Sequence, residues 1–134
     1  MAIKFGRLIL DSTNPAKLYH FLSFIFDVEA DSKIGEQINF EFGQLRFLIQ
    51  ATSDEKTQVD ITGHKKLDFS ISVDEENELT QISQSIEFYY YKESISNFYL
   101  KIADHRLEFS DPEGRIWLVE CVESTSIDIS AAIL

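Results

Sequence analysis

The ten residues DPEGRIWLVE, at positions 111–120, are typical of a tight turn followed by a short apolar strand. Pro112 sets φ for the second position of the turn, and Gly114 is able to take the left-handed conformation that the exit of such a turn often needs. A strand points successive side chains to opposite faces, so Trp117 and Leu118 are expected on different sides of a sheet. The stretch therefore predicts the closing strand of a sheet.

Outward from this stretch, the chain carries the same order of predicted elements twice, as an internal duplication would. Helical and alternating apolar spacing predict the elements of the first half, a strand, a helix and two strands at residues 3–10, 15–26, 34–42 and 45–51. The same spacing predicts those of the second half, a strand, a helix and three strands at residues 67–73, 74–90, 95–103, 106–110 and 115–122. The closing strands align on Gly43 and Gly114 with one extra residue after Gly43, which places Leu48 opposite Leu118. The pattern predicts an α+β fold and also allows other α+β sandwiches, including a ferredoxin-like one.

At 134 residues the chain is expected to form one domain. We divide it into a first module at 1–52, a polar linker at 53–66, a second module at 67–124 and a C-terminal tail at 125–134. The tail is apolar for a chain end, and an exposed apolar segment is a liability. We expect it to pack onto the protein or onto a partner subunit.

The composition excludes several classes of function. The net charge of −11 and a pI near 4.6 argue against nucleic acid, because phosphate binding needs a basic face. The same charge attracts cationic small molecules weakly. Cys121 is the single cysteine, which rules out an internal disulfide. With neither a membrane-length apolar run nor a visible signal peptide, the expected location is cytoplasmic.

Three stretches, 14–29, 67–74 and 111–120, together resemble the glyoxalase / bleomycin-resistance / extradiol-dioxygenase superfamily, whose fold is called vicinal oxygen chelate. The match of 14–29 to the usual first helix is partial. The resemblance implies two βαβββ modules whose sheets curl into a cup. It also implies dimers, which are common in folds of this kind because one module's sheet leaves an open edge. The expected partners are a small molecule and a second copy of the chain.

Strand alternation, read on this fold, predicts which side chains face the cup. The predicted ligand-binding residues are Phe5, Arg7, Arg46, Leu48, Gln50, Asp68, Ser70, Ser72, Ile116, Leu118 and Glu120. Ile9 faces the same way. Asp68 and Glu120 either anchor a cationic or hydrogen-bonding ligand, or form internal pairs with Arg7 or Arg46.

The resemblance also says where a metal would be held. The family's usual ligand positions, carried over residue by residue, fall on Phe5, Leu48, Asp68 and Leu118, of which three are apolar. One carboxylate does not hold a catalytic divalent ion, which typically takes about three protein ligands. A one-residue shift of register leaves the set equally poor in ligands. We therefore predict no metal, no cofactor and no catalytic residues.

Two further features have competing interpretations. The histidines His20, His64 and His105 share no spacing that puts two on one face, and we expect each to be solvated. The aromatic run at 88–91 is either a second core layer or an aromatic lip for a planar ligand or a dimer contact, because consecutive helix residues cannot all face one side.

Three functions remain open. The first is a metal-free protein that sequesters a small organic ligand in its cup, cationic ligands included. The second is a metal-dependent lyase, isomerase or dioxygenase of the superfamily with relocated ligands, such as Asp68, Glu120 and one histidine. The third is a structural or interaction module whose cup is filled by its own side chains.

Overall fold

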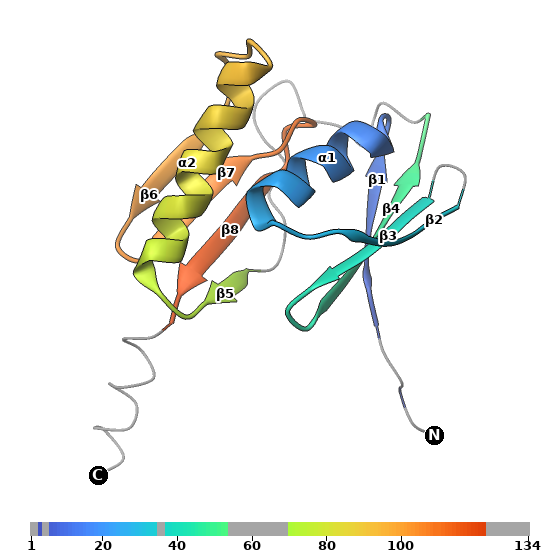
Figure 1. The fold of residues 1–134 in the computed structure, drawn as a ribbon, viewed down its shortest axis with the longest axis horizontal. Helices are drawn as coiled ribbons and strands as arrows, with labels where there is room; N and C mark the ends of the chain where they lie inside the picture. The colour runs from blue at the N-terminus through green and yellow to red at the C-terminus, as the bar shows by residue number, and fades with distance from the viewer. Residues whose placement is uncertain (1–2, 4–5, 35–36, 54–69, 123–134) are drawn as a thin grey trace.

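The computed structural model describes Ile3 and residues 6–34, 37–53 and 70–122 (Figure 1). The elements of the first module are β1 (Leu8–Ser12), α1 (Pro15–Phe26), β2 (Ala30–Ile34), β3 (Gln37–Phe42) and β4 (Leu45–Ala51). Those of the second module are β5 (Ile71–Val73), α2 (Glu76–Lys92), β6 (Leu100–Ala103), β7 (Arg106–Ser110) and β8 (Ile116–Cys121).

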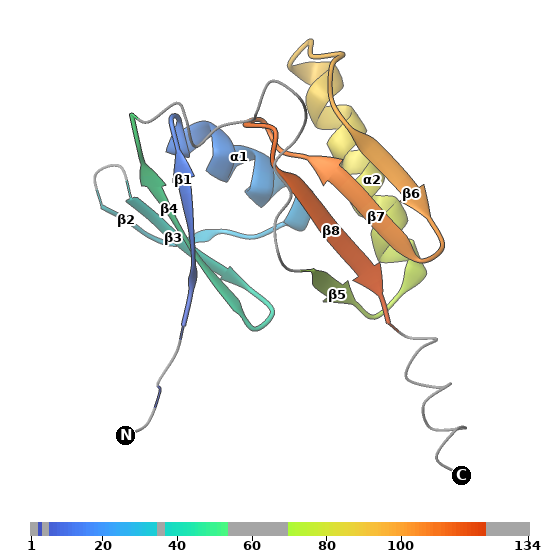
Figure 2. The same ribbon diagram turned by 180° about the vertical axis from the view of Figure 1, so that it is seen from behind.

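The strands form two four-stranded sheets with the same internal order. The first runs β1-β4-β3-β2 and the second β5-β8-β7-β6. In each, the first strand of the module is parallel to the last, and the other pairings are antiparallel. The predicted duplication of βαβββ modules is thereby confirmed. Among the described residues, the two sheets stay separate and are not closed into one (Figures 1 and 2).

Helix α1 begins and ends at residues with suitable local chemistry. The side chain of Asn14 accepts a hydrogen bond from the amide of Lys17 at 3.2 Å, and Pro15 occupies the first helical position. Asp27 ends the helix in the left-handed conformation, with φ of 54°. The sequence predicted this helix at 15–26, and its buried residues are Leu18, Phe21, Leu22 and Ile25.

Helix α2 starts at a capping box in which Glu75 and Glu78 satisfy each other's orphan amides. Acidic residues in its first turn and Lys92 in its last suit the helix dipole. Its aromatic run divides between two environments. Tyr89 and Tyr90 are buried, while Phe88 and Tyr91 are exposed by 55% and 82%. The run therefore supplies a core layer and also leaves two rings on the surface.

The two modules share one core between their helix-bearing sides. Helix α1 packs on α2 as well as on strands of its own sheet. Phe21 meets Tyr89 with ring centroids 5.0 Å apart. Trp117, on β8, lies 6.1 Å from Phe26 and 5.9 Å from Phe47 of the first module. Each sheet therefore turns its helix side toward the other module and its other side away from this core.

Some predicted boundaries differ from the structure. The strand predicted at 34–42 corresponds to β3, whereas β2 precedes it and was not predicted. Strand β1 runs on to Ser12. The strand predicted at 95–103 is formed only at its end, as β6. Gly114 takes the predicted left-handed conformation with φ of 88°. The start of the strand predicted at 67–73, most of the linker and the whole of the tail lie outside the described residues.

In the part of the chain that the structure describes, no helix is long and apolar enough to cross a membrane.

Candidate functional site

The outer face of the first sheet is the side that points away from α1. It carries the predicted ligand-binding residues of β1 and β4. Phe47 and Ile49 point into the core, so Leu48 and its alternate neighbours lie on the outer face. At its centre Leu48 pairs in register with Ile9, and Ile9 is 57% exposed. The centre of this face is therefore aliphatic.

Polar side chains surround this aliphatic centre and bond to one another. Arg7 donates from Nη1 to Oδ1 of Asn39 at 2.8 Å. Gln50 donates from Nε2 to Oδ1 of Asp11 at 2.7 Å. Arg46 forms an ion pair with a neighbour on β3 at 3.2 Å. Three predicted site residues, Arg7, Arg46 and Gln50, thus lie on one face with Leu48.

The outer face of the second sheet carries the remaining described candidates. Trp117 and Val119 are fully buried on the helix side, and Leu118 and Glu120 alternate with them onto the outer face. Ser72 pairs in register with Glu120 and is exposed, as is Ser70. Ile116 is only 9% exposed, so most of its surface is covered.

Glu120 has a partner that the sequence did not indicate. Its carboxylate lies 3.4 Å from Nε of Arg106, directly across the sheet on β7. Within one chain Glu120 therefore pairs with Arg106 of its own sheet, whereas Arg7 and Arg46 bond to residues of the first sheet. Both members are about a third exposed or more, so the pair stabilises the fold weakly.

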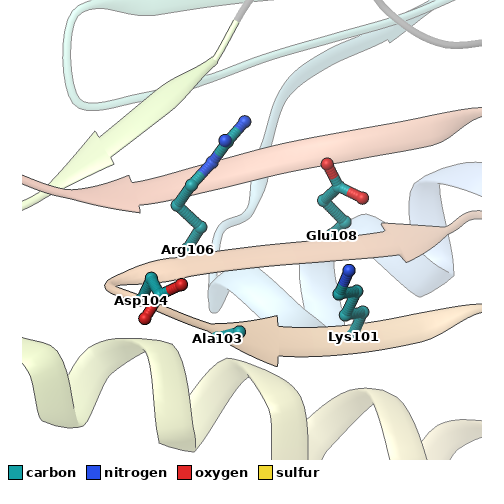
Figure 3. A pocket seen from close by; sticks show the side chains of 5 residues that line it. All are labelled: Lys101, Ala103, Asp104, Arg106 and Glu108. Carbon is teal, nitrogen blue, oxygen red and sulfur yellow. The ribbon is translucent and has the colours of Figure 1, made fainter.

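Beside this pair, the β6–β7 hairpin forms a shallow hollow of about 200 Å³. Its lining residues are Lys101, Ala103, Asp104, Arg106 and Glu108. Figure 3 shows Lys101, Arg106 and Glu108 rising on the same side of the hairpin, with Arg106 lying over the neighbouring strand. Tyr99 donates to Glu108 at 2.9 Å, and this hydrogen bond raises the pKa of Tyr99.

The strand alternation of 100–110 was sufficient to place Arg106 and Glu108 on the same face as Leu118 and Glu120. Strands were predicted there from the sequence, but neither Arg106 nor Glu108 was included among the predicted ligand-binding residues.

The described residues do not suit the divalent metal that the fold suggests. Two of the four expected ligand positions are Leu48 and Leu118, whose side chains offer no donor atom. Within the described ranges, no three His, Cys, Asp or Glu side chains lie close enough together to hold an ion. The other two positions, Phe5 and Asp68, lie outside the described residues.

The two histidines among the described residues lie on different elements. His20 is exposed on α1, with its ring 5.9 Å from that of Tyr89. His105, in the β6–β7 turn, contacts the carboxylate of Glu76. His64 lies outside the described residues.

Solved structures identify the architecture. A possible glyoxalase from Bacillus cereus superposes with a TM-score of 0.61 at 15% identity, over 90% of this chain and 100% of that one. The fosfomycin resistance protein FosX from Listeria monocytogenes, complexed with Mn(II) and sulfate, superposes with a TM-score of 0.68 at 12% identity, over 96% of this chain and 99% of that one. Lactoylglutathione lyase from Agrobacterium tumefaciens superposes with a TM-score of 0.61 at 15% identity, over 92% of this chain and 95% of that one.

The chain has the vicinal oxygen chelate fold. The fold expected from the three sequence stretches is confirmed. No protein-family model matches the sequence, and a search of curated proteins found no match. At identities of 12–15% these likenesses establish the architecture and leave ligand and chemistry open.

Proposed function

We propose that this vicinal oxygen chelate protein binds a small organic ligand on its outer sheet faces without a metal, and sequesters the ligand without transforming it. The observation that carries the proposal is the matched pair Leu48 and Leu118. Both occupy the position where the resemblance expects a metal ligand, and an aliphatic side chain cannot coordinate a cation.

The surroundings of the two leucines suit binding. Ile9 beside Leu48 leaves apolar surface exposed, and burying such surface under a ligand is favourable by roughly 25 cal/mol per Å². Polar groups that flank the leucines, such as Gln50 and Glu120, provide orientation. The net charge of −11 favours the approach of cationic ligands.

We further propose that two copies of the chain complete the cup. Within one chain the modules pack through Phe47, Phe26 and Trp117 on their helix sides, which leaves the two outer faces apart. A homodimer in which the first sheet of one copy meets the second sheet of the other brings Leu48 and Leu118 to one site. Light scattering after size exclusion should give twice the monomer mass, and a monomer that binds ligand stoichiometrically would contradict this part.

A thermal-shift screen with cationic, neutral and anionic organic compounds tests binding. We expect at least one class to raise the unfolding temperature in proportion to the logarithm of its concentration. Ile9→Asp should abolish that shift. Ile102→Asp is the matched control, because Ile102 is 49% exposed on the opposite face of its own sheet. The proposal would be refuted if no compound raised the unfolding temperature, or if both variants lost the ligand-induced rise equally.

The second candidate is a metal-dependent enzyme. It is favoured by one observation, the likeness to FosX complexed with Mn(II) and to lactoylglutathione lyase. It requires a ligand set other than Leu48 and Leu118. Elemental analysis of protein purified without chelator distinguishes the two, since stoichiometric Mn, Fe, Ni or Zn would reverse the ranking.

A further inference from the structure

The turn between β7 and β8 lies at the joint between the two modules, beside the end of β1 and the start of α1 (Figures 1 and 2). It buries three charged side chains. The side chains of Asp111, Glu113 and Arg115 are 0%, 9% and 10% exposed. We call these three residues, with Ser12 and Thr13 of the first module, the clasp.

Glu113 joins the modules through its two carboxylate oxygens. Oε1 accepts from Oγ of Ser12 at 3.0 Å, from the amide of Thr13 at 2.8 Å and from Oγ1 of Thr13 at 3.3 Å. Oε2 accepts from Nη1 of Arg115 at 2.8 Å. Hydrogen bonds to an ionised group are about twice as strong as those between neutral groups. One carboxylate thus binds both sides of the joint.

Arg115 adds a second connection and is itself held in place. Its Nη2 donates to the main-chain carbonyl of Asp11 in the first module. Its Nη1 lies 3.3 Å from Oδ2 of Asp111, which also accepts from the indole of Trp117 at 3.0 Å. Asp111 further accepts two amides of its own turn through Oδ1.

A buried ionic group is costly unless its hydrogen bonds are satisfied. Among the described residues, no buried side-chain nitrogen or oxygen lacks a partner. A fully satisfied buried polar network makes its surroundings rigid and specifies one arrangement. The clasp therefore defines one relative position of the modules.

The clasp also reaches the outer face of the first sheet through Asp11. The main-chain carbonyl of Asp11 accepts from Arg115, and its side chain accepts from Gln50 on that outer face. A displacement of the Asp11 main chain also moves the Cβ atom from which its side chain extends. A shift of Arg115 therefore displaces the bond between Asp11 and Gln50.

We propose that Glu113 and Arg115 are positioning residues, which fix the relative position of the two modules and, through Asp11, the arrangement of the outer face of the first sheet. The inference rests on the proposed function only in treating that face as the one that binds ligand.

The test needs no ligand. Glu113→Gln and Ser12→Ala each remove part of the clasp, and Glu87→Gln makes the same charge change as the first at an exposed position of α2. Nuclear magnetic resonance follows the side-chain amide of Gln50 and hydrogen exchange at the amide of Thr13. We expect both clasp variants to shift the Gln50 signals, and Glu113→Gln to speed exchange at Thr13 by about tenfold or more. Glu87→Gln should change neither.

Wild-type Gln50 signals in both clasp variants would overturn the proposal. If Glu113→Gln fails to fold, the Gln50 signals of Ser12→Ala still test the proposal, because Ser12→Ala leaves the ion pair between Glu113 and Arg115 in place. A ligand screen without hits would refute the proposed function and leave these measurements as they stand.

Discussion

Replacing Phe47 by alanine tests whether the two modules unfold as one unit. Phe47 belongs to the first module and is 1% exposed. Its ring stacks on Phe40 at 5.0 Å and meets Trp117 of the second module at 5.9 Å. Truncating a buried phenylalanine costs about 3–5 kcal/mol, through lost apolar burial and the cavity that remains. In a domain of this size, that corresponds to a fall in Tm of about 10–20 °C.

The assay is urea unfolding followed both by the fluorescence of Trp117 and by circular dichroism. Trp117 is the single tryptophan and lies in the other module, so its signal reports coupling directly. Phe24→Ala is the control, since Phe24 is 42% exposed and stacks on Phe88 at the surface. It should cost no more than about 1 kcal/mol. A Trp117 transition that stays at the wild-type midpoint in Phe47→Ala would refute the shared core.

Three further predictions concern single residues. Burial raises the pKa of Tyr90, with a smaller effect in the same direction from Asp111 and an opposing one from its hydrogen bond to Ser110. The folded protein then keeps the proton that the unfolded chain releases, so stability falls as the pH rises above about 10. Tyr90→Phe should lose about 1 kcal/mol at neutral pH and show a shallower alkaline fall in Tm, and an equally steep fall would contradict this cause. Cys121 is 6% exposed and should react with thiol reagents only on unfolding, so rapid labelling of folded protein would disprove its burial. Asp27→Gly relieves a φ of 54° and should raise the free energy of unfolding by about 0.5–1 kcal/mol, against which a lower urea midpoint would count.

The parts of the fold that the sequence predicted are those with local causes. Asn14 and Pro15 fix the start of α1, and Gly114 fixes the turn into β8. Strand β2 was missed because four of its five residues, ADSK, are neither β-branched nor aromatic, and Ile34 is its single residue with a strong strand preference. Its formation depends on pairing with β3.

For the candidate site, alternation predicted which face Leu48, Leu118 and Glu120 occupy, because side-chain direction follows from strand geometry. It gave no information on which charges meet. Glu120 pairs with Arg106, and Glu113 bonds to Ser12 across 101 positions of sequence. Contacts of that kind depend on the tertiary arrangement, as does the packing of the two modules through their helix sides.

The separation of the two halves along the chain has a consequence during translation. A ribosome finishes the first module well before it adds Trp117, and domains generally fold as units in the order of synthesis. Until then Phe47 and Phe21 have no second module to cover them. The nascent polypeptide therefore exposes apolar surface for the time needed to add some seventy residues, roughly four to fourteen seconds at usual rates of synthesis. Chaperone protection of these two side chains would be needed at least through that interval.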